Sequence, residues 1–134
     1  MTDLRIEVPC RMIITGPSNS GKTTLLINLL EANQKCFNEK LGKIYWCGGI
    51  LREEETKLIR KKLGNVTFIE GFPAEEIKNG TLVPKNENAC LILDDLGHEL
   101  EKSQELKYIF TMMSHHDKIN VFLLLQVSLK FFIM

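Results

Sequence analysis

Residues 16–23 read Gly16-Pro17-Ser18-Asn19-Ser20-Gly21-Lys22-Thr23 and match the pattern G-x-x-x-x-G-K-[ST] at every fixed position. A short apolar run, 12–15, precedes this stretch, and leucines at helical spacing follow it within 22–31. A strand, a glycine-rich loop and a helix in this order let backbone amides and a helix N-terminus surround an anion. The stretch therefore predicts a phosphate-binding loop.

Each loop position has a predicted role in holding a nucleoside triphosphate. Gly16 and Gly21 permit the tight turns that aim successive backbone amides at phosphate oxygens. Lys22 is predicted to reach the β- and γ-phosphates, the Thr23 hydroxyl to ligate Mg²⁺, and Thr24 to contact the α-phosphate. The residues predicted to bind nucleotide are Gly16, Pro17, Ser18, Asn19, Ser20, Gly21, Lys22, Thr23 and Thr24. ATP and Mg²⁺ are therefore the expected ligand and cofactor.

A second acidic element lies about 70 residues further along the chain, where the apolar run 90–93 ends in Asp94 and Asp95. A continuous apolar run is typical of a parallel strand that is buried on both faces. Ligands bind at the carboxyl ends of such strands. Asp94 is therefore predicted to hold the hydration shell of Mg²⁺ beside Thr23, and Asp95 to orient or deprotonate the attacking water.

A third polar position follows the apolar run 121–125, which is a predicted strand ending at Gln126. Some P-loop ATPases have an extra strand between the loop-bearing strand and the acid-bearing strand, and a polar residue at its end senses the γ-phosphate. An amide suits this role because it can hydrogen-bond both phosphate and water. The predicted catalytic residues are Lys22, Asp95 and Gln126, and the last two favour a hydrolysing ATPase over a small kinase.

Apolar runs alternate with amphipathic segments along the rest of the chain, which is the pattern of a parallel sheet covered by helices. Further strands are predicted at 43–47 and 66–69, and further helices at 53–63, 74–78 and 104–113. Within 53–63 acids precede bases, which complements the helix dipole; the charges are expected to face solvent, and Gly64 to end the helix. We expect an α/β P-loop NTPase fold with three layers and a mainly parallel sheet of about five strands.

The composition limits the classes of protein to which the chain can belong. It has 134 residues, 44% of them hydrophobic, and 17 basic residues balance 17 acidic ones. The length fits one domain, the apolar fraction supports a packed core, and the zero net charge argues against a strongly basic nucleic-acid module.

The scattered cysteines and the absence of long apolar runs indicate an intracellular protein. No two of the four cysteines form a Cys-x-x-Cys pair, so reduced thiols are expected rather than disulfides or a zinc site. The first residues lack the apolar run of a signal peptide, and no stretch approaches the roughly 20 apolar residues that span a bilayer. We expect a cytoplasmic or nuclear location with no membrane contact.

Taken in order, these motifs resemble the DNA-packaging ATPases of the FtsK–HerA superfamily, in particular those of poxviruses and of Maverick/Polinton transposons. The resemblance is carried by 9–23, by 66–73 with its Glu-Gly-Phe-Pro, by 91–96, and by Ser114-His115-His116 leading to 122–126. It implies a homo-oligomeric ring that hydrolyses ATP to move double-stranded DNA. In such rings a basic residue of the neighbouring subunit completes the site.

The chain also departs from that family. All four arginines lie in the first half of the chain, so none is assigned as the residue that completes a neighbour's site. The family continues beyond Gln126 into further strands. We therefore expect an ATPase core at 1–126, a truncated or divergent tail at 127–134, and an unpaired sheet edge where a final strand is missing.

Two alternatives to an active motor remain open. One is a degenerate or fragmentary module that binds nucleotide without turnover, which an early chain end would favour. The other is a small P-loop kinase, which would need a lid with arginines after the acid-bearing strand; the sequence has no arginine there.

Overall fold

A computed structural model describes residues 4–17, 19–49, 52–82, 87–96 and 119–126. The elements are β1 (Arg11–Gly16), α1 (Lys22–Glu31), α2 (Asn33–Cys36), β2 (Ile44–Gly48), α3 (Glu53–Leu63), β3 (Val66–Glu70), α4 (Ala74–Asn79), β4 (Cys90–Asp94) and β5 (Asn120–Gln126). The ends of the predicted elements agree within one residue, and the short α2 was not predicted. The helix predicted at 104–113, Ser114-His115-His116 and the tail 127–134 lie outside the described residues.

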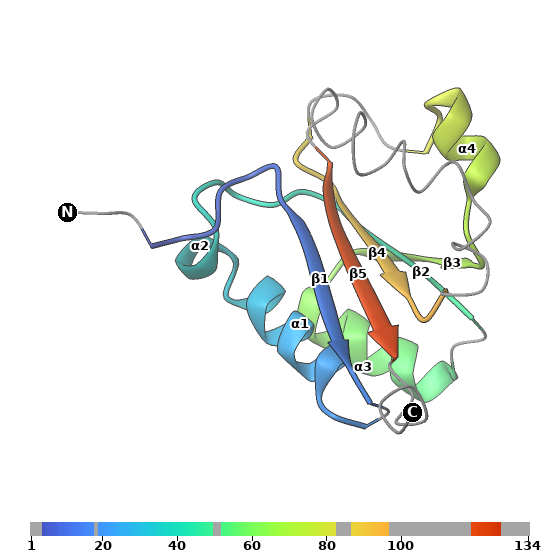
Figure 1. The fold of residues 1–134 in the computed structure, drawn as a ribbon, viewed down its shortest axis with the longest axis horizontal. Helices are drawn as coiled ribbons and strands as arrows, with labels where there is room; N and C mark the ends of the chain where they lie inside the picture. The colour runs from blue at the N-terminus through green and yellow to red at the C-terminus, as the bar shows by residue number, and fades with distance from the viewer. Residues whose placement is uncertain (1–3, 18, 50–51, 83–86, 97–118, 127–134) are drawn as a thin grey trace, which may run out of the picture.

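The five described strands form one parallel sheet in the order β1-β5-β4-β2-β3. Strand β5, late in the sequence, therefore lies between β1 and β4 (Figure 1). The register pairs Gly16 with Gln126, and Asp94 with both Leu124 and Gly48. The carboxyl ends of four strands thus meet at one edge, and the predicted α/β fold with a parallel sheet of five strands is confirmed.

Two apolar clusters cover opposite faces of the sheet. Helices α1 and α3 pack on the face that contains Trp46, Ile92 and Phe122. Helix α4 contributes Ile77 to the other face, which includes Leu91 (Figure 1). Burial on both faces explains why β2, β4 and β5 read as continuous apolar runs in the sequence.

Strand β1 lies at the border of the described sheet. Among the described strands it pairs with β5 alone. The edge expected from a missing final strand stays a prediction, because the tail 127–134 lies outside the described residues. The residues of β1 alternate between exposed and half-buried, and Ile13 is 59% exposed. The loop after Gly16 therefore leaves the sheet from the strand that borders it within the described ranges.

The four cysteines are free thiols, and three of them lie in the core. Burial raises the pKa of Cys10 to about 11 and that of Cys47 to about 12, and it also raises the pKa of Cys90. None of the helices within the described ranges combines the length and the apolar character needed to cross a membrane.

The amino edge of the sheet is held by a buried amide that the sequence analysis did not single out. Asn120 is fully buried, and its Oδ1 accepts a 2.8 Å hydrogen bond from the Cys10 backbone N–H. Its Nδ2 donates to the carbonyls of Asn88 at 3.1 Å and Ala89 at 3.2 Å. This one side chain therefore connects the starts of β1, β4 and β5.

Candidate functional site

The loop between β1 and α1 is tightly folded, and its backbone favours glycine at two positions. A Cβ atom on Gly16 would lie 2.7 Å from Ser20 Oγ, so the Ser20 side chain would have to move. Gly21 has a φ of 95°, and Asn19 adopts the left-handed region at 61°. Asparagine tolerates this region better than most residues because its short polar side chain can bond locally. The loop therefore has the close turns that the sequence predicts.

The N-terminus of α1 differs from those of α3 and α4. Its N-cap is Gly21, which has no side chain that could accept bonds from the first-turn amides, and its first turn contains no acid. By contrast, three glutamates begin α3, and two lie in the first turn of α4. The amides and the positive end of the helix dipole at α1 are consequently available to an anion.

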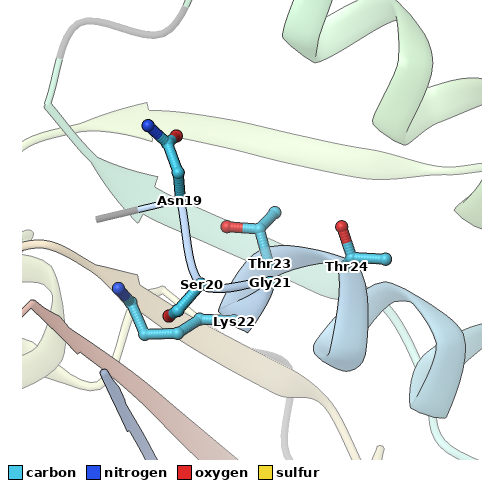
Figure 2. A pocket seen from close by; sticks show the side chains of 6 residues that line it. All are labelled: Asn19, Ser20, Gly21, Lys22, Thr23 and Thr24. Carbon is cyan, nitrogen blue, oxygen red and sulfur yellow. The ribbon is translucent and has the colours of Figure 1, made fainter. Parts of the chain in front are cut away.

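A cavity of about 340 Å³ lies over this loop and is lined by residues 19–24. Figure 2 shows the Lys22 side chain running back past Ser20, while the hydroxyls of Thr23 and Thr24 stand on the first turn of α1. The Lys22 ammonium donates hydrogen bonds to the carbonyls of Gly16 at 2.8 Å and Pro17 at 2.9 Å. Residues 19–24 thus surround one space, whereas Ser18 lies outside the described residues.

Asp94 ends β4 in a partly buried position where its charge is only partly compensated. Trp46 Nε1 donates a 3.3 Å hydrogen bond to its Oδ2. Burial raises the pKa of Asp94, the Trp46 bond lowers it, the carboxylates of Asp95 and Glu55 raise it, and the Lys22 ammonium lowers it, with a net rise. Lys22 and Asp94 therefore lie close enough to interact electrostatically, although 72 positions separate them in the sequence.

The other two predicted catalytic residues lie at the same edge. Asp95 has a φ of 53°, its backbone N–H donates to the Leu124 carbonyl at 3.1 Å, and its side chain is exposed. Backbone in this region is uncommon for a side-chain-bearing residue and is concentrated at functional sites. Gln126 is exposed at the end of β5, opposite Gly16 in the register. Asp95 and Gln126 are thus both accessible from the edge that carries the loop.

The residues at this edge fit a hydrated Mg²⁺ ion shared with phosphate. Within the described ranges, no group of three or more histidine, cysteine and acidic side chains could hold a metal alone. Magnesium bound to a nucleotide needs no such group, since phosphates and waters supply most of its ligands beside one or two protein oxygens. Asp94 is desolvated by burial and also lies near the carboxylates of Asp95 and Glu55, and a divalent cation would offset both effects.

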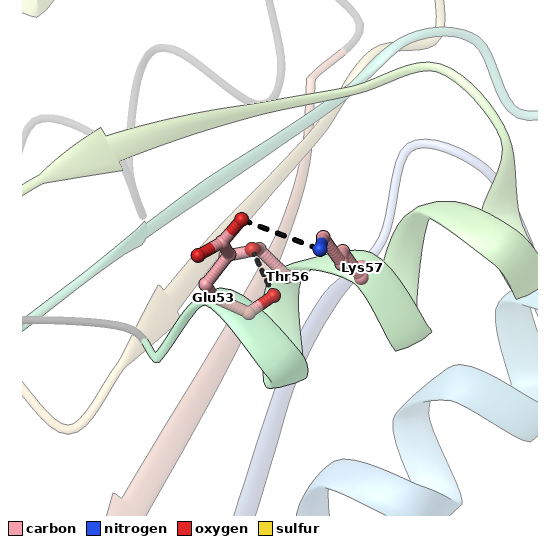
Figure 3. Close-up of polar contacts among 3 residues, drawn as sticks. All are labelled: Glu53, Thr56 and Lys57. Atoms are coloured by element: carbon pink, nitrogen blue, oxygen red, sulfur yellow. Dashed lines mark hydrogen bonds and ion pairs between the residues drawn. The ribbon is translucent and has the colours of Figure 1, made fainter.

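Two residues near Asp94 were missed by sequence reasoning. Trp46 lies inside an apolar strand and carries no functional pattern. Glu55 belongs to helix α3, whose charges were expected to face solvent; all of its charged residues are exposed, so that expectation is confirmed. Figure 3 shows the first turn, where exposed Glu53 pairs with Lys57 at 3.3 Å. Glu55 is exposed as well, but its charge also raises the pKa of Asp94, which no local pattern in the sequence reveals.

The same turn of α3 is closed by a local hydrogen bond. The Thr56 hydroxyl donates to the Glu53 carbonyl at 2.8 Å, three residues earlier (Figure 3). Arg52 at the N-cap makes no side-chain capping bond, so glutamates rather than a cap complement the helix dipole here.

Comparison with protein-family models gives no match for this chain, and comparison with curated proteins gives no significant match. The resemblance to FtsK–HerA packaging ATPases therefore stays a prediction that rests on the motifs in the sequence.

Proposed function

We propose that this chain binds Mg·ATP at residues 16–24 and hydrolyses the bond between the β- and γ-phosphates. The observation that carries the proposal is the proximity of Lys22, beside an open helix N-terminus, to a partly buried carboxylate at Asp94. One element attracts phosphate and the other attracts a cation, so together they suit a metal-bound triphosphate.

The loop residues would bind and orient the phosphates. The Lys22 ammonium, which bonds the carbonyls of Gly16 and Pro17, would exchange these partners for β- and γ-phosphate oxygens. The backbone amides that follow Gly21 would donate to the same group. Thr23 and Asp94 would hold Mg²⁺, which, when bound, offsets the negative charge of the phosphate oxygens.

Asp95 and Gln126 would act on the attacking water. Asp95 is exposed and would accept a hydrogen bond or a proton from that water, while the Gln126 amide would bond the water and the γ-phosphate. The position of β5 between β1 and β4 supports this assignment over a kinase, because an additional strand is thereby inserted between loop and acid.

Titration calorimetry with ATP, in the presence and absence of Mg²⁺, tests binding, and single-turnover phosphate release tests hydrolysis. Lys22→Ala should weaken both signals, whereas Lys35→Ala in α2, an exposed lysine away from the loop, should leave them unchanged. A lack of saturable ATP binding would contradict the proposal. Tight binding without phosphate release would instead identify a nucleotide-binding module without turnover.

We further propose, on the motif resemblance alone, that the ATPase is the core of a ring-forming motor that moves double-stranded DNA. Phosphate release should then rise when linear double-stranded DNA is added. Light scattering should detect assembly in Mg·ATP. Unchanged turnover over a range of DNA lengths would remove DNA from the proposal and leave the ATPase assignment intact.

A further inference from the structure

Strand β2 shapes the surroundings of Asp94 although it contributes no residue to the phosphate loop. The parallel register sets Trp46 opposite Ile92 and Gly48 opposite Asp94. Trp46 reaches diagonally along the sheet, and its indole N–H donates to Asp94 Oδ2 at 3.3 Å. This bond links a fully buried side chain to the acid at the end of the neighbouring strand.

The indole is held firmly by its own packing. Trp46 is 0% exposed, and its ring lies 6.4 Å from that of Phe68 on β3. The guanidinium of Arg60 in turn lies 4.8 Å from the centre of the Phe68 ring. A large side chain enclosed in this way has little rotational freedom, so its N–H is a fixed donor.

Gly48 leaves the space that this arrangement needs. A Cβ atom at that position would lie 3.3 Å from the Asp94 carbonyl oxygen and 3.5 Å from Asp94 Cβ. Any larger side chain would press on the acid from the neighbouring strand. Strand β2 thus supplies a donor to Asp94 and, at Gly48, a close approach of the two strands that a side chain would crowd.

We infer that Trp46 is a positioning residue that fixes the Asp94 carboxylate for the metal, an inference that rests on the proposed function. The indole bond to Oδ2 would hold the carboxylate in one orientation, in which it could help to hold the cation. Partners that orient a metal-binding side chain typically change metal affinity by about 10- to 100-fold when they are removed.

The hydrogen bond can be observed directly in solution because Trp46 is the single tryptophan of the chain. A ¹H–¹⁵N spectrum therefore contains one indole cross-peak. Asp94→Ala removes the acceptor and should shift this peak upfield. Asp95→Asn removes the neighbouring charge but not the acceptor, and should move it much less. Equal peak positions in the unaltered chain and in Asp94→Ala would overturn the inference.

The functional test compares nucleotide affinity with and without Mg²⁺. Trp46→Phe keeps an aromatic ring but lacks the donor, so it should reduce the gain in ATP affinity on adding Mg²⁺ by roughly 10-fold. Affinity without Mg²⁺ should be unchanged. Phe68→Leu loosens the same packing without touching the bond and should retain the full gain.

Each outcome separates this inference from the proposed function. If Trp46→Phe keeps the full Mg²⁺-dependent gain, Trp46 is a core residue only, and the ATPase proposal stands. If Phe68→Leu loses the gain as Trp46→Phe does, general packing rather than the hydrogen bond is responsible. The inference about Trp46 then fails, and the ATPase proposal still stands. If the unaltered chain binds no Mg·ATP, the proposed function and this inference fall together.

Discussion

The two edges of the sheet differ in how far the protein compensates a buried polar side chain with hydrogen bonds. At the amino edge, Asn120 is fully buried, and both ends of its amide are bonded to backbone groups. At the carboxyl edge, Asp94 is partly buried, receives one bond from Trp46, and has an elevated pKa. The first group is compensated by the protein itself, whereas the second is left with a charge that the protein compensates incompletely.

This difference separates a structural site from a site suited to binding. A buried polar group with all of its partners stabilises the fold, and removing it leaves those buried partners without a hydrogen bond. A carboxylate that is desolvated and close to other acids costs stability, and the cost is recovered when a cation binds. The comparison therefore predicts opposite stability changes for substitutions at the two edges.

The largest effect is expected for Asn120→Ala. The substitution leaves the Cys10 N–H and the carbonyls of Asn88 and Ala89 without their side-chain partner, so the free energy of unfolding should fall by about 3 kcal/mol. Urea unfolding followed by circular dichroism measures this change. Asn28→Ala, at an exposed position of α1, should change stability by less than about 0.5 kcal/mol. A similarly small change for Asn120→Ala would remove the contrast between the edges.

Lys22→Ala should produce the next largest effect, on turnover rather than on folding. Loss of one preorganised cationic donor should slow phosphate release about 100-fold, equivalent to about 2.7 kcal/mol. Pre-steady-state assays at saturating Mg·ATP measure the rate. A turnover within threefold of the unaltered chain would contradict the role given to this ammonium.

Asp94→Asn should stabilise the ligand-free chain by about 1 kcal/mol, the size of gain that is common when a strained functional site is relieved. Because burial raises the pKa of Asp94 above its ordinary 3.8, the folded state holds this proton more tightly than the unfolded state. The unaltered chain therefore loses stability as pH rises from about 3.8 through the elevated value, and the asparagine variant does not.

Thermal unfolding between pH 3.5 and pH 8 tests this dependence. The two chains should match at the acid end and diverge as pH rises, reaching a constant difference at neutral pH. The same variant should lose the Mg²⁺-dependent gain in ATP affinity. An asparagine variant less stable than the unaltered chain at pH 7 would mean that Asp94 is compensated as fully as Asn120.

The smallest expected effect concerns Glu55. Glu55→Gln removes one of the acids that raise the pKa of Asp94, so this pKa should fall while staying above its ordinary value, because burial is the largest cause. The stability gain should be below about 0.5 kcal/mol. Carbon-detected NMR titration measures the pKa. Glu54→Gln, in the same turn, is the matched control and should leave the pKa of Asp94 unchanged. Equal pKa shifts in both variants would show that the charge of the whole turn acts on Asp94, and not Glu55 in particular.

Local patterns in the sequence were enough to predict every described element except the short α2. Helices α1 and α3 have the predicted ends, and Gly64 ends α3 with a φ of 82°. These features depend on residues a few positions apart, whose periodicity, charge order and backbone freedom are readable without the fold. The glycine positions of the loop followed in the same way, since Gly16 lies close to Ser20 within the loop and Gly21 has a positive φ.

The sequence by itself determined the five described strands, the helices α1, α3 and α4, and the polar residues that follow the strands. Only the tertiary structure decided that Trp46 bonds Asp94 across 48 positions and that Asn120 bonds Cys10 across 110. Strand order and register set these pairs. Apolar strands such as β2 and β4 have similar sequences, so the sequence does not indicate which strand each one pairs with. The physical reason is that the hydrophobic effect is non-directional. The apolar pattern therefore specifies which strands are buried, and the packing of the whole chain decides which strands pair.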